Sequence, residues 1–141
     1  IEERVDARRR NFELYREALD SEPGISFMPE PKECRSTRWL TALLIDPEEF
    51  GATREEIRQH LEEKNIEARP LWKPLHLQPV FRDHRAVGGG VSESLFELGL
   101  CLPSGSSLST ADLERVVAAI QSVPRRSSVS TSGSRGRSAT V

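Results

Sequence analysis

Apolar and charged residues alternate with a helical period at the start of the chain. Between residue 1 and about residue 20 the apolar positions fall on one stripe, made up of Ile1, Val5, Phe12, Tyr15 and Leu19. The pattern predicts a long helix that Pro23 and Gly24 end. Three arginines at residues 8–10 interrupt the stripe, so we expect the helix to be only partly covered by its own domain. The chain starts within this pattern and without a methionine, which suggests a fragment.

Capping boxes mark the starts of two further helices. Thr53 and Glu56 form the first box, and Ser109 and Asp112 form the second. Each box precedes an apolar stripe at helical spacing, with Ile57 and Leu61 in the first helix and Leu113, Val116, Val117 and Ile120 in the second. The first of these helices is expected to end near residue 65. A shorter helical pattern covers residues 95–98.

Short apolar runs between the helices have the length and composition of strands. Residues 39–45 are apolar and are closed by Asp46 and Pro47, so they predict a buried central strand. Shorter strands are expected at residues 25–28, 66–68 and 100–102. The strand at 66–68 leads directly into a segment with three prolines.

That segment, RPLWKPLHLQPVF at residues 69–81, concentrates the candidate chemistry. Its prolines forbid a regular helix and remove donors that a central strand needs, so it is expected to be a fixed loop. The loop carries an aromatic face, two cations, an imidazole and an amide, contributed by Arg69, Trp72, Lys73, His76 and Gln78. These groups suit a polar, anionic ligand.

Simpler interpretations of the same residues stay open. Trp72 is explained equally by packing in a domain with few aromatic residues, and Lys73 by surface solvation. Arg69 can form an ion pair with Glu67, two residues away, or with an acid across the sheet. His60 and His84 are expected to be solvated. A metal site formed by His76 and His84 lacks a third ligand at suitable spacing, so no metal is predicted.

Two glycine-rich or polar segments complete the chain. Residues 88–90 are three glycines without the spacing of a phosphate-binding fingerprint, and we interpret them as a hinge. From Pro124 onward the sequence is dominated by Ser, Thr, Gly and Arg, which predicts a disordered tail over residues 124–141. The folded domain is therefore expected to cover residues 1–123.

Charge and cysteine content exclude several classes of partner. The chain has a formal charge of −2, and because four arginines and no acid follow Pro124, the folded part carries −6. An acidic domain makes nucleic acid an unsuitable partner. Cys34 and Cys101 lie far apart with no further ligand nearby, as in a reduced, cytoplasmic protein. No apolar run reaches membrane-spanning length.

Several segments resemble one enzyme family. RPLWKPLHLQPVF, followed by SESLFELGLCLPSGSSLSTADLERVVAAI, is similar to the carboxy-terminal portion of the DegT/DnrJ/StrS family of pyridoxal phosphate (PLP)-dependent nucleotide-sugar aminotransferases. PGISFMPEP, WLTALLIDPEEFG and NIEARPLWKP stand in the family's order. The resemblance covers residues 1 to about 123. It implies an α/β (α+β) fold, the small domain of a fold-type-I aminotransferase, with a short, mainly antiparallel sheet flanked by helices and a long connecting helix at residues 1–20.

The resemblance also implies a reaction and a place for the loop. The family transfers an amino group from an amino acid such as glutamate to a nucleotide-linked keto sugar, with PLP as cofactor and usually as a homodimer. By analogy Trp72, Lys73, His76 and Gln78 lie near the active-site mouth, where Trp72 packs on sugar or base while Lys73 and His76 meet diphosphate or hydroxyl oxygens. The turn at residues 103–105 supports this wall.

No catalytic residue is expected in this chain. The family's Schiff-base lysine and phosphate cup belong to the large domain, and the lysines present here, residues 32, 64 and 73, do not stand in the Schiff-base context. The isolated chain is therefore expected to be inactive. Two alternatives remain: a non-catalytic binding or interaction module derived from the same family, and an unrelated metal or nucleic-acid binder that charge and ligand spacing disfavour.

Overall fold

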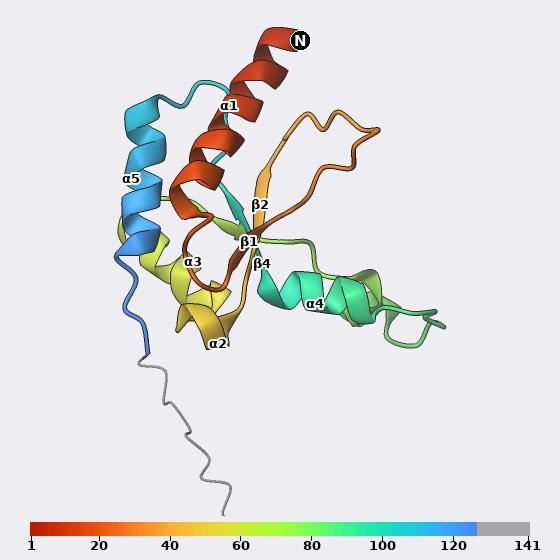
Figure 1. Cartoon of the computed structure of the whole chain (residues 1–141). Coiled ribbons are helices and arrows are strands. Elements are labelled where there is room, and N and C mark those ends of the chain that lie inside the picture. Colours follow the sequence, from red (N-terminus) through yellow and green to blue (C-terminus); the bar gives the residue numbers. More distant parts are fainter. Residues whose placement is uncertain (127–141) are drawn as a thin grey trace, which may run out of the picture.

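A four-stranded antiparallel sheet organises the fold, in the order β1-β2-β4-β3 (Figure 1). The computed structural model describes residues 1–126. Its strands are β1 Ile25–Phe27, β2 Thr41–Ile45, β3 Arg69–Pro70 and β4 Gly99–Leu102. The two central strands pair from Thr41 opposite Leu102 to Leu44 opposite Gly99. The predicted central strand is confirmed, although it begins at Thr41 and leaves Trp39 outside.

The prediction of a strand at residues 66–68 is wrong, because the residues that pair with β4 directly follow this segment. Ile66 and Ala68 turn into the core and are buried, and Ile66 N donates to the carbonyl of Leu61 at the end of the preceding helix. The strand itself is Arg69–Pro70, which pairs with Cys101 and Leu100 of β4. Pro70 is tolerated here because β3 is an edge strand, so the backbone groups on its outer side need no hydrogen bond to another strand.

Three helices cover one face of the sheet. They are α1 Glu2–Leu19, α3 Arg54–Glu63 and α5 Thr110–Gln121, and α5 packs against both of the others (Figure 1). Both predicted capping boxes are present, with Thr53 and Ser109 accepting from the N3 backbone N–H groups. A one-turn helix, α2 Pro47–Phe50, was not predicted; the carboxylate of Asp46 accepts from its first N–H groups.

The core lies between this helical layer and the sheet. The predicted helix faces are buried, and they pack with alternate residues of the central strands; the cluster includes Tyr15, Leu19, Leu43, Ile45, Ile57, Leu61, Leu100, Leu102, Leu113, Val116 and Ile120. Ile1, the first position of the predicted stripe, is exposed, and Val5 is half-buried. The first turns of α1 therefore extend beyond the core, as Figure 1 shows.

An arm projects from the other side of the sheet (Figure 1). It consists of the loop after β3 and helix α4 Gly90–Leu98, which returns directly into β4. The loop contains two short 3₁₀ turns, η1 Leu75–Leu77 and η2 Pro79–Phe81, so it is irregular as predicted. The helix begins at the predicted glycine hinge, earlier than the pattern at 95–98 suggested, because Gly89 adopts a φ of 121° that turns the chain into it.

The start of the predicted tail is held against the domain. Arg125 Nη2 lies 2.7 Å from Glu22 Oε2, and its guanidinium stacks over the ring of Phe50 at 4.2 Å. Arg126 N donates to the carbonyl of Gly51 at 2.8 Å. The first residues of the predicted tail, 124–126, are thus tied to the domain, and residues 127–141 lie outside the described residues. No helix within residues 1–126 is long and apolar enough to cross a bilayer.

Candidate functional site

The candidate site is built on the arm, which the sheet holds at both ends. Leu71 N donates to the carbonyl of Gly99 at 3.2 Å, and helix α4 ends where β4 begins. Inside the loop, the amide of Gln78 donates to the carbonyl of Lys73 at 3.2 Å. Pro74 is buried and leads into the first 3₁₀ turn. These contacts hold the loop in one path without regular secondary structure.

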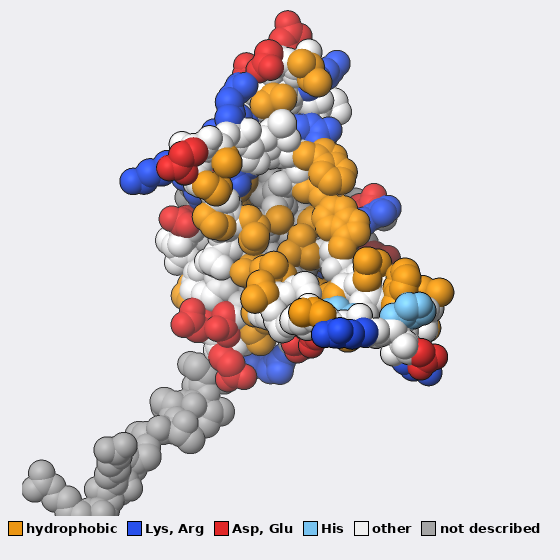
Figure 2. All heavy atoms as spheres, turned by 90° about the vertical axis from the view of Figure 1, so that its right-hand side faces the viewer, with side chains coloured by type: hydrophobic (Ala, Val, Ile, Leu, Met, Phe, Trp, Pro, Cys, Tyr) orange, Lys and Arg blue, Asp and Glu red, His pale blue; other side chains and the backbone are white. Residues whose placement is uncertain are grey.

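Trp72 lies outside the core and pairs with a second tryptophan. Its side chain is 66% exposed and that of Trp39 is 60% exposed, while their ring centroids are 5.8 Å apart with planes inclined by 33°. Trp72 therefore packs on Trp39 at the surface and not in the core. The sequence placed Trp39 in the buried strand and so missed it as a site residue. Figure 2 shows apolar side chains gathered on this face.

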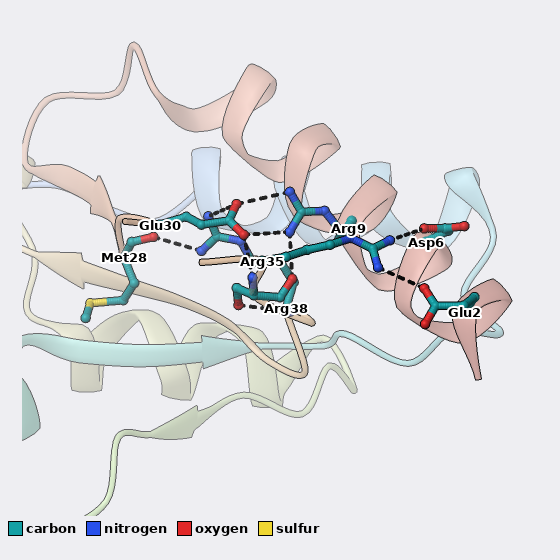
Figure 3. A network of polar contacts seen from close by, with 8 residues as sticks. Glu2, Asp6, Arg9, Met28, Glu30, Arg35 and Arg38 are labelled. Carbon is teal, nitrogen blue, oxygen red and sulfur yellow. Dashed lines mark hydrogen bonds and ion pairs between the residues drawn. The ribbon is translucent and has the colours of Figure 1, made fainter. Parts of the chain in front are cut away.

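A polar network fixes the backbone on which Trp39 stands (Figure 3). Glu30 receives two hydrogen bonds from the guanidinium of Arg9, at 2.8 and 3.0 Å, and Arg38 donates to the carbonyl of Met28 at 2.9 Å. Arg8 donates to the carbonyl of Trp39 itself at 2.6 Å. The hydrogen bonds from Arg9 and from Ser36 N lower the pKa of Glu30 to about 2. Two of the arginines that interrupt the apolar stripe of α1, Arg8 and Arg9, thus hold the segment at residues 30–39.

A cleft with a volume of about 520 Å³ is lined in part by Trp72. The cleft lies beside strands β3 and β4. Its lining is mostly apolar and also includes the charged residues Glu67, Arg69 and Arg115. Cys101 forms part of the wall, and burial raises the pKa of its thiol. Arg69 bonds to Glu67, with Nε 2.7 Å from Oε1, so the predicted ion pair is confirmed.

The turn at residues 103–105 borders this cleft and is tied to α1. The carbonyl of Pro103 accepts from the hydroxyl of Tyr15 at 2.9 Å, and that of Gly105 accepts from the amide of Asn11 at 2.9 Å. Ser104 is buried; its hydroxyl accepts from Thr41 N at 2.7 Å and donates to the carbonyl of Leu102. This turn is a rigid wall, held by side chains rather than by strand pairing.

His76 occupies a different surface of the arm. Its Nε2 lies 2.7 Å from Oε1 of Glu93 in α4, and its side chain is 24% exposed. The ring packs so closely on Gly89 that a Cβ there would lie 2.9 Å from His76 Cε1. The sequence missed Glu93, because no spacing rule links positions in a loop and in the helix after it. A hollow of about 250 Å³ lies beside His76.

The four predicted contact residues do not share one cavity. Trp72 lines the large cleft, His76 lines the smaller hollow, Lys73 is exposed, and Gln78 is tied to the loop backbone. His60, expected to be solvated, instead lies with Nε2 3.1 Å from the hydroxyl of Ser122. Within residues 1–126, no three His, Cys, Asp or Glu side chains are grouped to hold a metal ion.

The residues present do not form a site for PLP. Such a site needs a lysine amino group directed into a cavity beside a phosphate cup. All three lysines, at residues 32, 64 and 73, are exposed, and none lines the 520 Å³ cleft or the 250 Å³ hollow.

Comparison with known proteins gives consistent matches. A model of the DegT/DnrJ/EryC1/StrS aminotransferase family matches residues 1–121. EpsN of Bacillus subtilis, whose name assigns it to the PLP-dependent aminotransferases, is 46% identical over 122 residues, covering 83% of this chain and 30% of EpsN. The GDP-perosamine synthase of Escherichia coli O157:H7 is 29% identical over 119 residues, covering 84% of this chain and 30% of that protein.

A solved structure reproduces the fold. The aminotransferase TlmJ from Streptoalloteichus hindustanus superimposes with a TM-score of 0.76 at 24% identity, over 86% of this chain and 32% of TlmJ. The sheet and helices described above are therefore those of one part of an aminotransferase. The chain spans about 30% of the length of the curated relatives that it matches.

Proposed function

Because this chain belongs to the DegT/DnrJ/EryC1/StrS aminotransferase family, we propose that it forms the carboxy-terminal part of a PLP-dependent aminotransferase acting on a nucleotide-linked keto sugar. The amino donor is an amino acid such as glutamate. The complete enzyme is cytoplasmic and a homodimer. Residues 1–123 form its small domain, with α1 as the connecting helix.

The observation that carries this proposal is the match over residues 1–121 together with the length of the relatives. The relatives include a GDP-perosamine synthase, whose name identifies a nucleotide-linked amino sugar as its product. When bound, PLP withdraws electrons from the carbon that gains or loses the amino group. This chain has no site for that group, so its contribution is to bind and orient the sugar nucleotide.

The arm supplies the groups for this task. Trp72, with Trp39 beside it, offers an exposed aromatic surface on which a sugar or a base packs. Lys73 and His76 provide donors for diphosphate or hydroxyl oxygens, and Gln78 holds the loop that carries them. Since the backbone is fixed by prolines and by its ties to β4, little conformational entropy is lost when the ligand binds.

The test starts with the native polypeptide, isolated from source cells with an antibody against this chain. We expect a mass far above 15.8 kDa. Incubated with PLP, ¹⁵N-glutamate and GDP- or UDP-linked keto sugars, it should place ¹⁵N in the sugar. A native product of 15.8 kDa that transfers no nitrogen would refute the proposal.

That result would support a non-catalytic binding or interaction module of the same family. The observation that favours this alternative is the exposure of all three lysines away from both cavities. The binding surface of such a module would be the same arm, so contacts to Trp72 and His76 would persist without amino transfer.

A further inference from the structure

The hollow beside His76 gathers nitrogen donors from one short stretch of the arm. Its volume is about 250 Å³, and it is lined by His76, His84 and Arg85 with the apolar side chains of Leu75, Phe81 and Val87. The ring of His84 stands edge-on to Phe81, at 5.9 Å between centroids and 78° between planes. Arg85 makes no ion pair with any residue of the described part of the chain. No acidic side chain lines the hollow.

Glu93 lies behind His76 and orients it. The carboxylate engages Nε2 at 2.7 Å, and the ring edge formed by Cε1 and Nε2 packs on the backbone of Gly89. The second ring nitrogen, Nδ1, has no hydrogen-bond partner within residues 1–126. A carboxylate that fixes one nitrogen of an imidazole directs the other toward a ligand. Glu93 is therefore a positioning residue for His76.

The size and the donors of the hollow decide which ligand it takes. A cavity of 250 Å³ is below the range for a whole nucleotide or a drug-sized molecule, but it admits one phosphoryl group. The guanidinium of Arg85 and the imidazole of His84 present N–H donors, which suit tetrahedral oxygens with delocalised charge. The Nε2–H of His76 is used by Glu93, so His76 adds a donor at Nδ1 in its imidazolium form. The start of α4, next to His76, adds the positive end of a nine-residue helix. Two nearby acids oppose binding: Asp83, next to His84 in sequence, and Glu93, whose carboxylate lies 2.7 Å from His76 Nε2.

We propose that His76, His84 and Arg85 form a binding site for a phosphoryl group, with Glu93 holding the imidazole of His76 in place. The inference rests on the proposed function, where it assigns this site to one phosphoryl group of the diphosphate of the sugar nucleotide. His84 and Arg85 thereby join the ligand contacts, and His84 is not merely solvated.

Because the hollow is formed entirely by residues 75–87, it can be tested in the 141-residue chain. The probe is pyrophosphate, titrated while the imidazole resonances of the protein are followed by NMR. We expect saturable shifts of His76 and His84 but not of His60. Arg85→Ala should weaken binding about tenfold or more, because a charge-assisted hydrogen bond is lost. The matched control is Arg82→Ala, an exposed arginine of the same loop that does not line the hollow.

The variant Glu93→Gln distinguishes two effects of Glu93: its orientation of the His76 ring and its negative charge. It removes a negative charge near the site, so a purely electrostatic effect would strengthen pyrophosphate binding. We expect weaker binding and a changed His76 tautomer, read from the ¹⁵N shifts of its ring. Tighter binding with an unchanged tautomer would overturn the role of Glu93.

Three outcomes would overturn the phosphoryl site: no saturable binding, equal losses for Arg85→Ala and Arg82→Ala, or glutamate binding as tightly as pyrophosphate. The last would reassign the hollow to a carboxylate. The amino-transfer assay is independent of these measurements. Pyrophosphate binding without transferase activity in the native polypeptide would refute the proposed function and leave the phosphoryl site standing.

Discussion

Replacing Tyr15 with phenylalanine removes one buried hydrogen bond and changes the packing little. The side chain has 0% exposure, and its hydroxyl donates to the carbonyl of Pro103 at 2.9 Å. The substitution leaves that carbonyl without its donor, at a cost of about 1–2 kcal/mol of unfolding free energy. For a folded domain of this size the loss corresponds to a decrease in Tm of about 4–8 °C.

The assay is urea and thermal unfolding followed by far-UV circular dichroism. Tryptophan emission is a poor probe here, since Trp39 and Trp72 are already exposed in the folded state. The matched control is Ser106→Ala, which removes an exposed contact with Arg4 at 3.3 Å and should change stability by less than about 0.5 kcal/mol. Equal stability of Tyr15→Phe and wild type would refute the reasoning, as would an equal loss in both variants.

Alkaline pH gives a second measure of the same hydroxyl. Burial, with a smaller contribution from Asp112, raises the pKa of Tyr15 well above its ordinary value of 10.0. The folded state therefore keeps this proton after the unfolded state has released it, and stability falls as pH rises above 10. Since Tyr15 is the only tyrosine of the chain, Tyr15→Phe should remove this decline. A decline of the same size in both proteins would assign it to other groups.

Four further predictions follow from the contacts described. The pKa of Glu30 is lowered from 4.5 to about 2, so Glu30→Gln should be less stable than wild type at pH 7, with the difference vanishing in melts between pH 4.5 and 2; a constant difference would contradict this. Gly99→Ala places a Cβ against the carbonyl of Leu95 and should cost about 2 kcal/mol in urea unfolding, whereas Gly90→Ala, which meets no atom within 4 Å, should not. The isolated chain should transfer no amino group and bind no PLP, and specific labelling of one lysine on borohydride reduction would disprove this. In the complete enzyme, His76→Ala should raise KM for the sugar nucleotide with little change in Tm, whereas a lower Tm with normal kinetics would make His76 structural.

Local signals in the sequence predicted most of the helices and the central strand. Capping boxes and apolar stripes depend on residues three or four positions apart, so Thr53 with Glu56 and Ser109 with Asp112 identified their helices directly. The edge strand was misplaced because Ile66 and Ala68 alternate with polar residues for a different reason: both turn into the core behind the strand.

The site was predictable only in part, because its partners meet through tertiary structure. The proline loop was correctly identified as irregular and rich in donors. Two of its residues meet partners that are distant in the sequence. Trp72 packs on Trp39, 33 positions away, and His76 contacts Glu93, 17 positions away. No periodic pattern records such contacts. The role of Arg8 and Arg9 was likewise hidden, since their acceptors lie in the segment after β1.

The edges of the sheet bear on how copies of this domain behave when concentrated. One edge, β1, has three residues, and the other, β3, has two, of which Pro70 offers no N–H donor. Neither edge presents a row of free donors and acceptors long enough to recruit a strand from another molecule. We therefore expect association at high concentration to occur through side-chain surfaces such as the exposed pair Trp39 and Trp72. We expect the resulting aggregates to be amorphous and to lack the 4.7 Å repeat of cross-β fibres.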